Sequence, residues 1–365
     1  MTEPILIDSH EDLAWNMLSF GRDYTLAAEE TRQREVGSLA PQVNGDTLLG
    51  WPDYQRGKVA VIFSTLFAAP LRRKLGDWDQ QSYADADEAH TCYSSQLDAY
   101  QRLVEEHPAM FRKIAQRIDL TAVLEHWQRS DTQEHPVGLV VLMEGAEGVR
   151  QPAELEEWYQ RGVRIIGPAW AGTRFCGGTR EAGGMTKEGY ALLDGMAEYN
   201  LTLDLSHMDE QAALQALDSY PGPIIASHAN ALALLKATGS NRHLSDKVIH
   251  ELLNRDGTIG VVLANHFLRP DWQEAGGRAS VGLDFVVAQL DYICQLAGNA
   301  LHAGIGTDFD GGFGLQSVPM ELDTIADVRK IIPILFQKGY TEADINAILG
   351  GNWLAYLNKA LPEVL

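Results

Sequence analysis

The chain of 365 residues has only three cysteines, Cys92, Cys176 and Cys294, and they are widely separated and outside any Cys-x-x-Cys pair. This spacing argues against a disulfide framework and fits a reducing compartment, so we expect a cytoplasmic protein. We expect Cys176, which lies in the loop sequence FCGGTREAGG, to be a bystander thiol without a role in catalysis.

Positive charge is also scarce. Lys and Arg total 29 against 50 Asp and Glu, which gives a net charge of -21 at pH 7. A chain of this charge repels a phosphate backbone and an anionic membrane surface. Nucleic acid is therefore excluded as an expected partner.

A long apolar segment is missing as well. No run of about 18 apolar residues occurs, and the first residues lack the basic cluster and apolar stretch of a signal peptide. We predict neither a membrane span nor a secretion signal.

What the sequence does contain is an ordinary globular composition, with 45% hydrophobic and 22% charged residues. Short apolar runs bounded by Gly, Pro, Asn and Asp recur along the whole chain. They are PILIDSH (4–10), KVAVIFSTLF (58–67), VGLVVLMEG (137–145), GVRIIGPAW (162–170), LTLDLSH (201–207), PIIASHAN (223–230), TIGVVLANH (258–266) and ALHAGIGTDFDG (300–311). Most are β-branched and nearly unbroken, which is typical of parallel strands covered on both faces.

Helical patterns separate these runs. In residues 245–257, for example, apolar residues recur at helical spacing after Ser245, a suitable N-cap. Eight strands with helical crossovers predict an α/β fold of the (β/α)8 TIM-barrel type, with a doubly wound open sheet as the alternative. We predict a single barrel domain over 1–365, with a helical elaboration around 68–136.

Several predicted strands end in a residue that can bind a metal. His10 and Asp12 follow the first strand, Glu144 the third, His207 the fifth, His228 the sixth and Asp308 the eighth. In a parallel barrel these carboxyl ends open onto one face, where barrel enzymes build their active sites. His266 and His302, near the last two strands, are expected to be packed or hydrogen-bonded core residues, with a role behind the metal ligands as the alternative.

The spacing of these residues predicts a pair of zinc ions. His10 and Asp12 are two apart on a strand and so point the same way. Imidazole and carboxylate suit zinc, whose catalytic sites usually keep three protein ligands and one open position. Two such sites need six contacts, which His10, Asp12, His207 and His228 complete if the carboxylate of Glu144 bridges both ions.

The motifs that carry these residues resemble those of a known family, the membrane (renal) dipeptidases of the peptidase M19 type, which are zinc enzymes with an amidohydrolase-type barrel. DSHEDL is similar to the family's D-G-H-N-D-L, MEG to its E-G-G, LDLSH to its V-D-L-S-H, IASHAN to its F-S-H-S-x, and GIGTDFDG to its G-x-G-x-D-F-D-G. GGNWLAYL near the C-terminus resembles its G-G-N helix. The motifs occur in the family's order along nearly the whole chain.

The resemblance implies the same division of ligands: His10 and Asp12 bind one zinc ion, His207 and His228 bind the other, and Glu144 bridges them. It further implies that Asp308 is the aspartate beside the bridging water. Its proton-transfer role would be that of a general base and then a general acid.

Two positions bear on substrate binding. Arg242 stands where the family has an arginine that binds the terminal carboxylate of the substrate, a task suited to a bidentate guanidinium. Trp170 stands where the family has a histidine that helps to bind substrate and stabilise the oxyanion. An indole offers one N–H donor and carries no positive charge, and the loss of one oxyanion donor costs roughly 100- to 1,000-fold in rate.

The expected function is that of a zinc-dependent dipeptidase-like hydrolase, in which a metal-bridging hydroxide cleaves the amide bond of a dipeptide or a similar small carboxylate-bearing amide. Because of Trp170, an alternative is the same centre acting on another small amide, an N-acyl amino acid or a lactam. A non-catalytic metal-binding homologue would be marked by missing ligands, and none is missing. A homodimer is compatible with a barrel of this size, although no segment identifies an interface.

Overall fold

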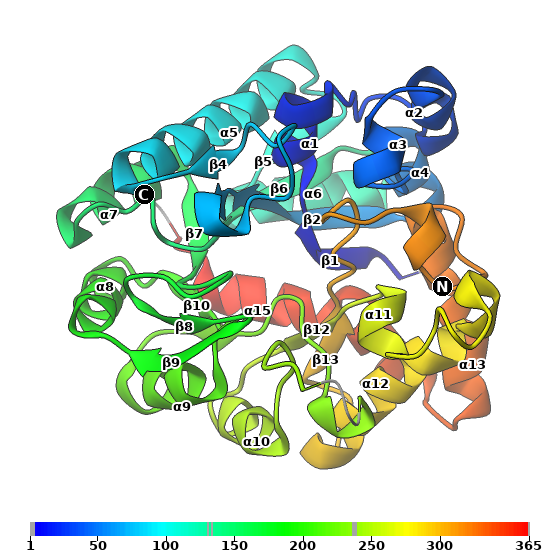
Figure 1. Cartoon of the computed structure of the whole chain (residues 1–365). Coiled ribbons are helices and arrows are strands. Elements are labelled where there is room, and N and C mark those ends of the chain that lie inside the picture. Colours follow the sequence, from blue (N-terminus) through cyan, green and yellow to red (C-terminus); the bar gives the residue numbers. More distant parts are fainter. Residues whose placement is uncertain (1–3, 130, 133, 236–238, 364–365) are drawn as a thin grey trace.

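The computed structural model describes residues 4–129, 131–132, 134–235 and 239–363, and its centre is a ring of parallel strands (Figure 1). These strands are β1 (Leu6–Glu11), β2 (Val59–Phe67), β6 (Val137–Glu144), β7 (Val163–Gly167), β10 (Thr202–Asp204), β11 (Ile224–Ile225), β12 (Ile259–Val261) and β13 (Ala303–Ile305). They are hydrogen-bonded in the order β11-β10-β7-β6-β2-β1-β13-β12. A parallel bridge between Ala226 and Ile259 joins the two ends, so the barrel is nearly closed. The predicted (β/α)8 class is confirmed, and the open-sheet alternative is wrong.

Helices surround the strands (Figure 1). They are α1 (Leu13–Phe20), α2 (Ala28–Glu35), α3 (Ala40–Val43), α4 (Trp51–Gly57), α5 (Ala86–Glu106), α6 (Arg117–Gln128), α7 (Leu155–Arg161), α8 (Lys187–Glu198), α9 (Glu210–Ser219), α10 (Asp246–Asn254), α11 (Asn265–Leu268), α12 (Leu283–Ala297), α13 (Ile331–Gln337), α14 (Glu342–Asn346) and α15 (Asn352–Ala360). Short 3₁₀ helices span Leu71–Arg73, Pro152–Glu154, Leu232–Leu234, Gly277–Ser280, Leu315–Ser317 and Ile325–Lys330, and a π-helical turn, Ala347–Gly351, joins α14 to α15. Short additional strands are β3 (Ala69–Pro70), β4 (Ser82–Tyr83), β5 (Phe111–Lys113), β8 (Cys176–Gly178) and β9 (Glu181–Met185).

The helix signals of the sequence act as expected. The hydroxyl of Ser245 accepts a hydrogen bond from the backbone N–H of Val248 and caps α10. Asp85 caps α5 in the same way, and α5 and α6 make up most of the helical stretch expected around 68–136. No helix in the described part of the chain combines the length and the apolar character that a membrane crossing requires.

The strands alternate between two apolar layers. Ile62 of β2 belongs to the layer between strands and outer helices, whereas its neighbours Val61 and Phe63 point into the barrel. The inner layer is completed by Trp353 of α15, whose ring lies 5.2 Å from that of Phe63 in an edge-on arrangement. Helix α15 therefore closes the amino-terminal end of the barrel, and the carboxyl end is left for the polar residues.

The interior of the barrel narrows toward the carboxyl ends of the strands. The Ser9 hydroxyl donates to the carbonyls of Ser227, at 2.5 Å, and Ile305, at 2.9 Å. A Cβ on Gly306 would lie 2.1 Å from the Ser227 carbonyl oxygen, so only glycine fits there. This close approach brings the loop after β11 next to the loop after β13.

Candidate metal centre

The six predicted ligand and proton-transfer residues all lie buried at the carboxyl end of the barrel. His10 is in β1, Asp12 directly precedes α1, Glu144 is the last residue of β6, and His207, His228 and Asp308 each lie three residues beyond the ends of β10, β11 and β13. The predicted strands at 201–207, 223–230 and 300–311 are therefore too long at their carboxyl ends. His207 (φ 67°) and Asp308 (φ 62°) adopt the left-handed conformation, which is incompatible with a strand, so neither of these two strands can extend as far as its metal-binding residue.

Glu144 lies between two pairs of predicted metal ligands. Its Oε1 is 2.8 Å from Nε2 of His207 and 3.3 Å from Nε2 of His228. Its Oε2 is 3.7 Å from Nε2 of His10, which in turn lies 3.6 Å from Oδ2 of Asp12. One carboxylate thus presents each of its oxygens to a different pair of side chains.

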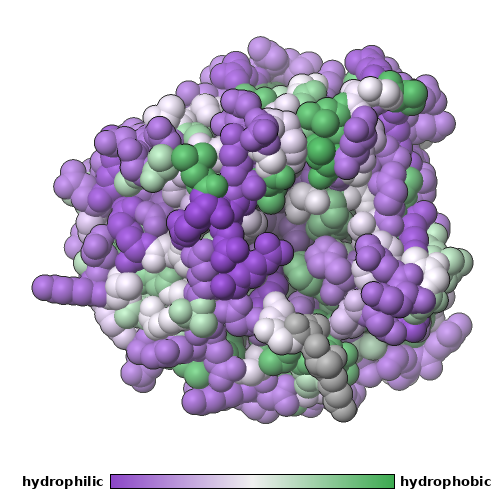
Figure 2. Space-filling model, in the orientation of Figure 1, coloured by the Kyte–Doolittle hydropathy of each residue, from purple (hydrophilic) through white to green (hydrophobic). Residues whose placement is uncertain are grey.

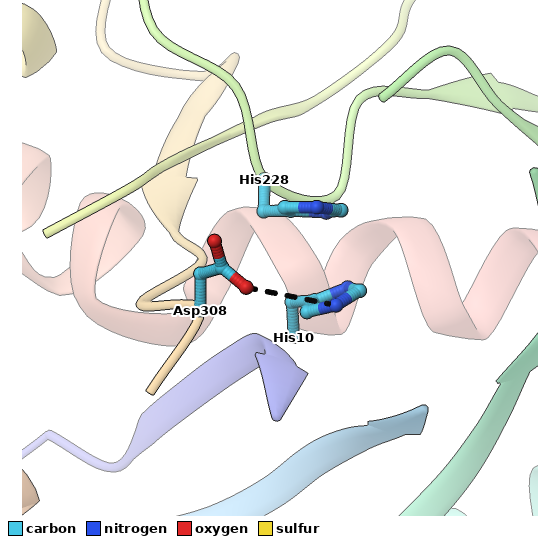
Figure 3. A group of neighbouring side chains, drawn as sticks. All are labelled: His10, His228 and Asp308. Carbon is cyan, nitrogen blue, oxygen red and sulfur yellow. Dashed lines mark ion pairs between the residues drawn. The ribbon is translucent and has the colours of Figure 1, made fainter. Parts of the chain in front are cut away.

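His10 also contacts His228 and Asp308, and these contacts link the two pairs of ligands. The rings of His10 and His228 stack with their centroids 3.6 Å apart, and Oδ1 of Asp308 lies 3.9 Å from Nε2 of His10 (Figure 3). Three overlapping sets of side chains have ligand atoms within 4.8 Å of one another. They are His10, Asp12 and Glu144; Glu144, His207 and His228; and His10, His228 and Asp308.

Hydrogen bonds behind the imidazoles decide which nitrogen faces the centre. Ser227 donates its hydroxyl proton to Oδ2 of Asp204 at 2.5 Å, so its oxygen is left to accept from Nδ1–H of His228 at 2.8 Å. Nε2 of His228 is then unprotonated and presents a lone pair toward Glu144. The Thr179 hydroxyl, 2.9 Å from Nδ1 of His207, has the corresponding place behind the second imidazole.

Burial sets the electrostatics of these groups. It raises the pKa of Glu144 well above its usual value, and the nearby carboxylates of Asp12 and Asp308 add to the effect. Burial likewise lowers the pKa of His207 and His228 well below that of a free imidazole, and the guanidinium of Arg242 adds to it.

His10 and Asp308 respond to each other as well as to burial. Burial disfavours the charged form of His10, but the carboxylates of Glu144, Asp12 and Asp308 outweigh it and raise the pKa of His10 to about 10. Burial is the main cause that raises the pKa of Asp308 to about 7, because the attraction of His10 offsets only part of it. The cluster thus holds several carboxylates that the protein alone leaves poorly compensated.

The donor set fits a divalent cation. Nε2 of His207 and Nε2 of His228 are 3.0 Å apart, and both ring nitrogens face Glu144. Oδ1 of the buried Asp12 has no hydrogen-bond partner among the described residues. Converging lone pairs of nitrogen and oxygen repel one another unless a positive charge lies between them, and this mixture of ligands suits zinc and related metals.

A cavity of about 330 Å³ opens over the cluster, at the low end of the volumes that bind small ligands. Figure 2 shows a hollow near the middle of this face, bordered by both hydrophilic and hydrophobic residues. Trp170 and Arg242 both line the cavity. Arg242 is 3% exposed, and its Nη2 donates to the carbonyl of His228 at 2.7 Å, while Nε and Nη1 have no partner among the described residues.

Other cavity residues were not predicted from the sequence. Trp15, Phe67, Trp78 and Thr179 also line the cavity, although nothing in their local sequence distinguishes them from core or loop residues. His266 lines it as well and is exposed, so the prediction of a packed core histidine is wrong at that position. β12 ends at Val261, so His266 belongs to the short helix α11 and not to the buried strand.

Nδ1 of His302, by contrast, is hydrogen-bonded to the carbonyl of Gly257 at 3.0 Å. Cys176 is buried, and burial raises the pKa of its thiol to about 12.

Comparisons with known proteins agree with this geometry. The sequence profile of the membrane dipeptidases (peptidase family M19) matches residues 1–361. A protein from Klebsiella pneumoniae described by its place in the pqqA 5′ region is 30% identical over 238 residues, 62% of this chain and 83% of that protein. Dipeptidase ataJ from Aspergillus terreus is 26% identical over 292 residues, 72% of this chain and 66% of that protein. The crystal structure of a metallopeptidase from Rhodobacter sphaeroides, bound to a phosphinate mimic of L-Ala-D-Ala, has the same fold, with a TM-score of 0.78 at 20% identity over 98% of this chain and 100% of that chain.

Proposed function

We propose, from the premise that this chain belongs to the membrane dipeptidase family of metal-dependent hydrolases, that it is a zinc enzyme that hydrolyses dipeptides or closely similar amides with a free carboxylate. The observation that supports a two-metal centre best is the position of Glu144, whose two oxygens face different pairs of ligands. His10 and Asp12 would hold one ion and His207 and His228 the other. When bound, the ions supply Lewis-acid polarisation of the scissile carbonyl and stabilise the charge that develops on its oxygen.

Asp308 is the proposed proton carrier. Its side chain is 12% exposed and lines the cavity, and burial raises the pKa of its carboxyl group to about 7, so it can both accept and release a proton near neutral pH. It takes the proton of the attacking water as the new C–O bond forms. It then gives that proton to the amine nitrogen as the C–N bond breaks.

Arg242 is the proposed anchor for the substrate's carboxylate. Its Nη2 donates to the His228 carbonyl, which fixes the guanidinium, while Nε and Nη1 have no partner among the described residues and leave N–H groups for the carboxylate of a substrate. His228, whose carbonyl holds Arg242, is itself one of the proposed metal ligands. The distance from the anchored carboxylate of the substrate to the metal centre is therefore fixed. A fixed distance and a cavity of about 330 Å³ both favour a dipeptide over a longer peptide.

The relatives support this choice of substrate. The Aspergillus terreus protein is a dipeptidase, and the ligand of the Rhodobacter sphaeroides metallopeptidase is a mimic of a dipeptide. Both matches extend over most of this chain.

The test combines metal analysis of the purified protein with a panel of L-L and L-D dipeptides, N-acyl amino acids and lactams. We expect about two zinc ions per chain and turnover of dipeptides. Asp308→Asn is expected to lower kcat on the order of 100- to 10,000-fold, whereas Asp256→Asn, an exposed control paired with Lys359, leaves it unchanged. Turnover of lactams or N-acyl amino acids with none of any dipeptide would contradict the proposed substrate, and full activity of Asp308→Asn would contradict the proton-carrier role.

A further inference from the structure

Four aromatic side chains form one side of the cavity, and we call them the aromatic wall: Trp15, Phe67, Trp78 and Trp170. The Phe67 ring lies 5.0 Å from that of Trp170 and 6.2 Å from that of Trp15, in edge-on arrangements. Trp78 extends the wall, with its ring 5.8 Å from that of Trp15. The four rings are therefore in continuous contact.

The aromatic wall is firmly held. Gln96 of α5 binds both backbone groups of Phe67, accepting from its N–H at 2.8 Å and donating to its carbonyl. Trp15 and Phe67 are 1% and 7% exposed, while Trp78 and Trp170 are partly exposed where they face the cavity. The wall thus presents a preformed apolar surface to a ligand.

The order of the strands places the aromatic wall opposite Arg242. Trp15 follows β1, Phe67 ends β2 and Trp170 follows β7, and these strands lie together in the run β7-β6-β2-β1. Arg242 follows β11 and is fixed to the His228 carbonyl, on the far side of the ring of strands. A substrate whose carboxylate is bound by Arg242 and whose scissile carbonyl lies at Glu144 must extend its acyl-side residue toward the wall.

Arg73 and Arg180 also line the cavity. Nε of Arg73 donates to Oε1 of Glu181 at 2.8 Å, and Glu181 pairs with Arg72 as well. The aromatic wall itself offers only rings, so a large apolar side chain gains contact there with aromatic faces and edges.

We infer that the aromatic wall is a specificity subsite that selects a large apolar, preferably aromatic, side chain on the acyl side of the bond to be cleaved. This inference rests on the proposed function and adds the substrate class to it. Trp170 is the specificity-determining residue, since it supplies an apolar surface at the position where a polar one would favour small or polar groups.

The test uses two peptides of identical composition, Phe-Gly and Gly-Phe, with Gly-Gly as the reference. We expect kcat/KM for Phe-Gly to exceed that for Gly-Phe on the order of 10- to 100-fold, the value of burying one aromatic side chain. Trp170→Ala should lower this ratio about tenfold, and Trp78→Ala, in a loop, should lower it in the same direction. The control, Phe336→Ala on the outer helix α13, changes an exposed aromatic residue and should leave the ratio unchanged.

Binding measured without turnover separates this inference from the proposed function. With Asp308→Asn, calorimetry gives the Kd of Phe-Gly and of Gly-Phe whether or not either is cleaved. Equal Kd values, or tighter binding of Gly-Phe, would overturn the inference even if dipeptides are hydrolysed. Tighter binding of Phe-Gly that Trp170→Ala abolishes would support it even if the wild-type protein cleaves no dipeptide, a result that would count against the proposed function alone.

Discussion

Ser227→Ala should weaken metal binding although Ser227 is not itself a ligand. The hydroxyl of Ser227 joins Oδ2 of Asp204, at 2.5 Å, to Nδ1 of His228, at 2.8 Å. Without it, nothing fixes the proton of His228 on Nδ1, and the tautomer with the proton on Nε2 has no lone pair for a metal. Removal of such a partner behind a ligand typically costs 10- to 100-fold in metal affinity, which is about 1.4 to 2.7 kcal/mol.

The same substitution also lowers the stability of the metal-free protein. Oδ1 of Asp204 keeps its bonds from the backbone N–H groups of Ser227, at 2.8 Å, and Ser206, at 3.0 Å, but Oδ2 loses its donor. A buried acceptor left without a partner costs about 1 to 3 kcal/mol. A melting temperature alone therefore mixes two effects, and the metal affinity has to be measured directly.

The suitable assay is competition for zinc against a chelator of known affinity, with Kd compared between wild type and variant. Ser95→Ala is the matched control, because the one hydrogen bond of the Ser95 side chain among the described residues is to the carbonyl of Cys92 within α5, and Ser95 does not line the cavity. The control should bind zinc as the wild type does. A zinc Kd for Ser227→Ala within twofold of the wild-type value would show that the hydroxyl does not orient His228.

Three further predictions concern the metal, an ionisable group and a thiol. Removal of the metal with a chelator should lower the free energy of unfolding by about 4 kcal/mol for each ion lost, relative to protein at a zinc concentration 1,000 times Kd. Denaturant titration measures this change, and an unchanged midpoint would refute a structural contribution of the ions. Burial lowers the pKa of His243 to about 3. The stability that neutral His243 contributes is therefore fully present above the unfolded-state pKa of about 6.5 and is lost as the pH falls below that value. Between pH 6.5 and 5, the free energy of unfolding of the wild type should fall by about 2 kcal/mol more than that of His243→Gln, and parallel pH profiles would contradict this. Burial raises the pKa of Cys176 to about 12, so iodoacetamide at pH 8 should leave this thiol unmodified in the folded protein and alkylate it after unfolding, as read by peptide mass spectrometry.

The barrel was predictable from sequence because its strands carry a strong physical signal. Each is buried on both faces, so its residues form an apolar run without alternation, and all eight runs correspond to strands of the barrel. Their ends were harder to place. At His207 and Asp308 the chain turns into the left-handed conformation, which residues other than glycine rarely adopt, so the apolar pattern of the local sequence gives no sign of it.

The convergence of the ligands was also predictable, because parallel strands place their carboxyl ends on one face. The side chains that orient the ligands could not be predicted from the sequence. Thr179 directly follows β8 and contacts the His207 ring from 28 positions away, and Asp204, at the end of β10, bonds to Ser227, which follows the neighbouring strand β11. Hydroxyl and carboxyl side chains of this kind are common in loops and strand ends, so only the folded chain shows which of them contact an imidazole.

The meaning of Trp170 changed most between sequence and structure. In the sequence it marks the loss of a histidine, and a lost oxyanion donor predicts a slower enzyme. In the structure its ring contacts Phe67 and completes an apolar surface whose other members, Trp15 and Trp78, come from segments that read as ordinary core or loop. If the aromatic wall binds an acyl-side aromatic group, Trp170→His should slow Phe-Gly more than Gly-Gly. A histidine that restored a missing oxyanion donor would instead raise kcat for both peptides by a similar factor, so the two interpretations of this residue predict changes of opposite sign for Phe-Gly.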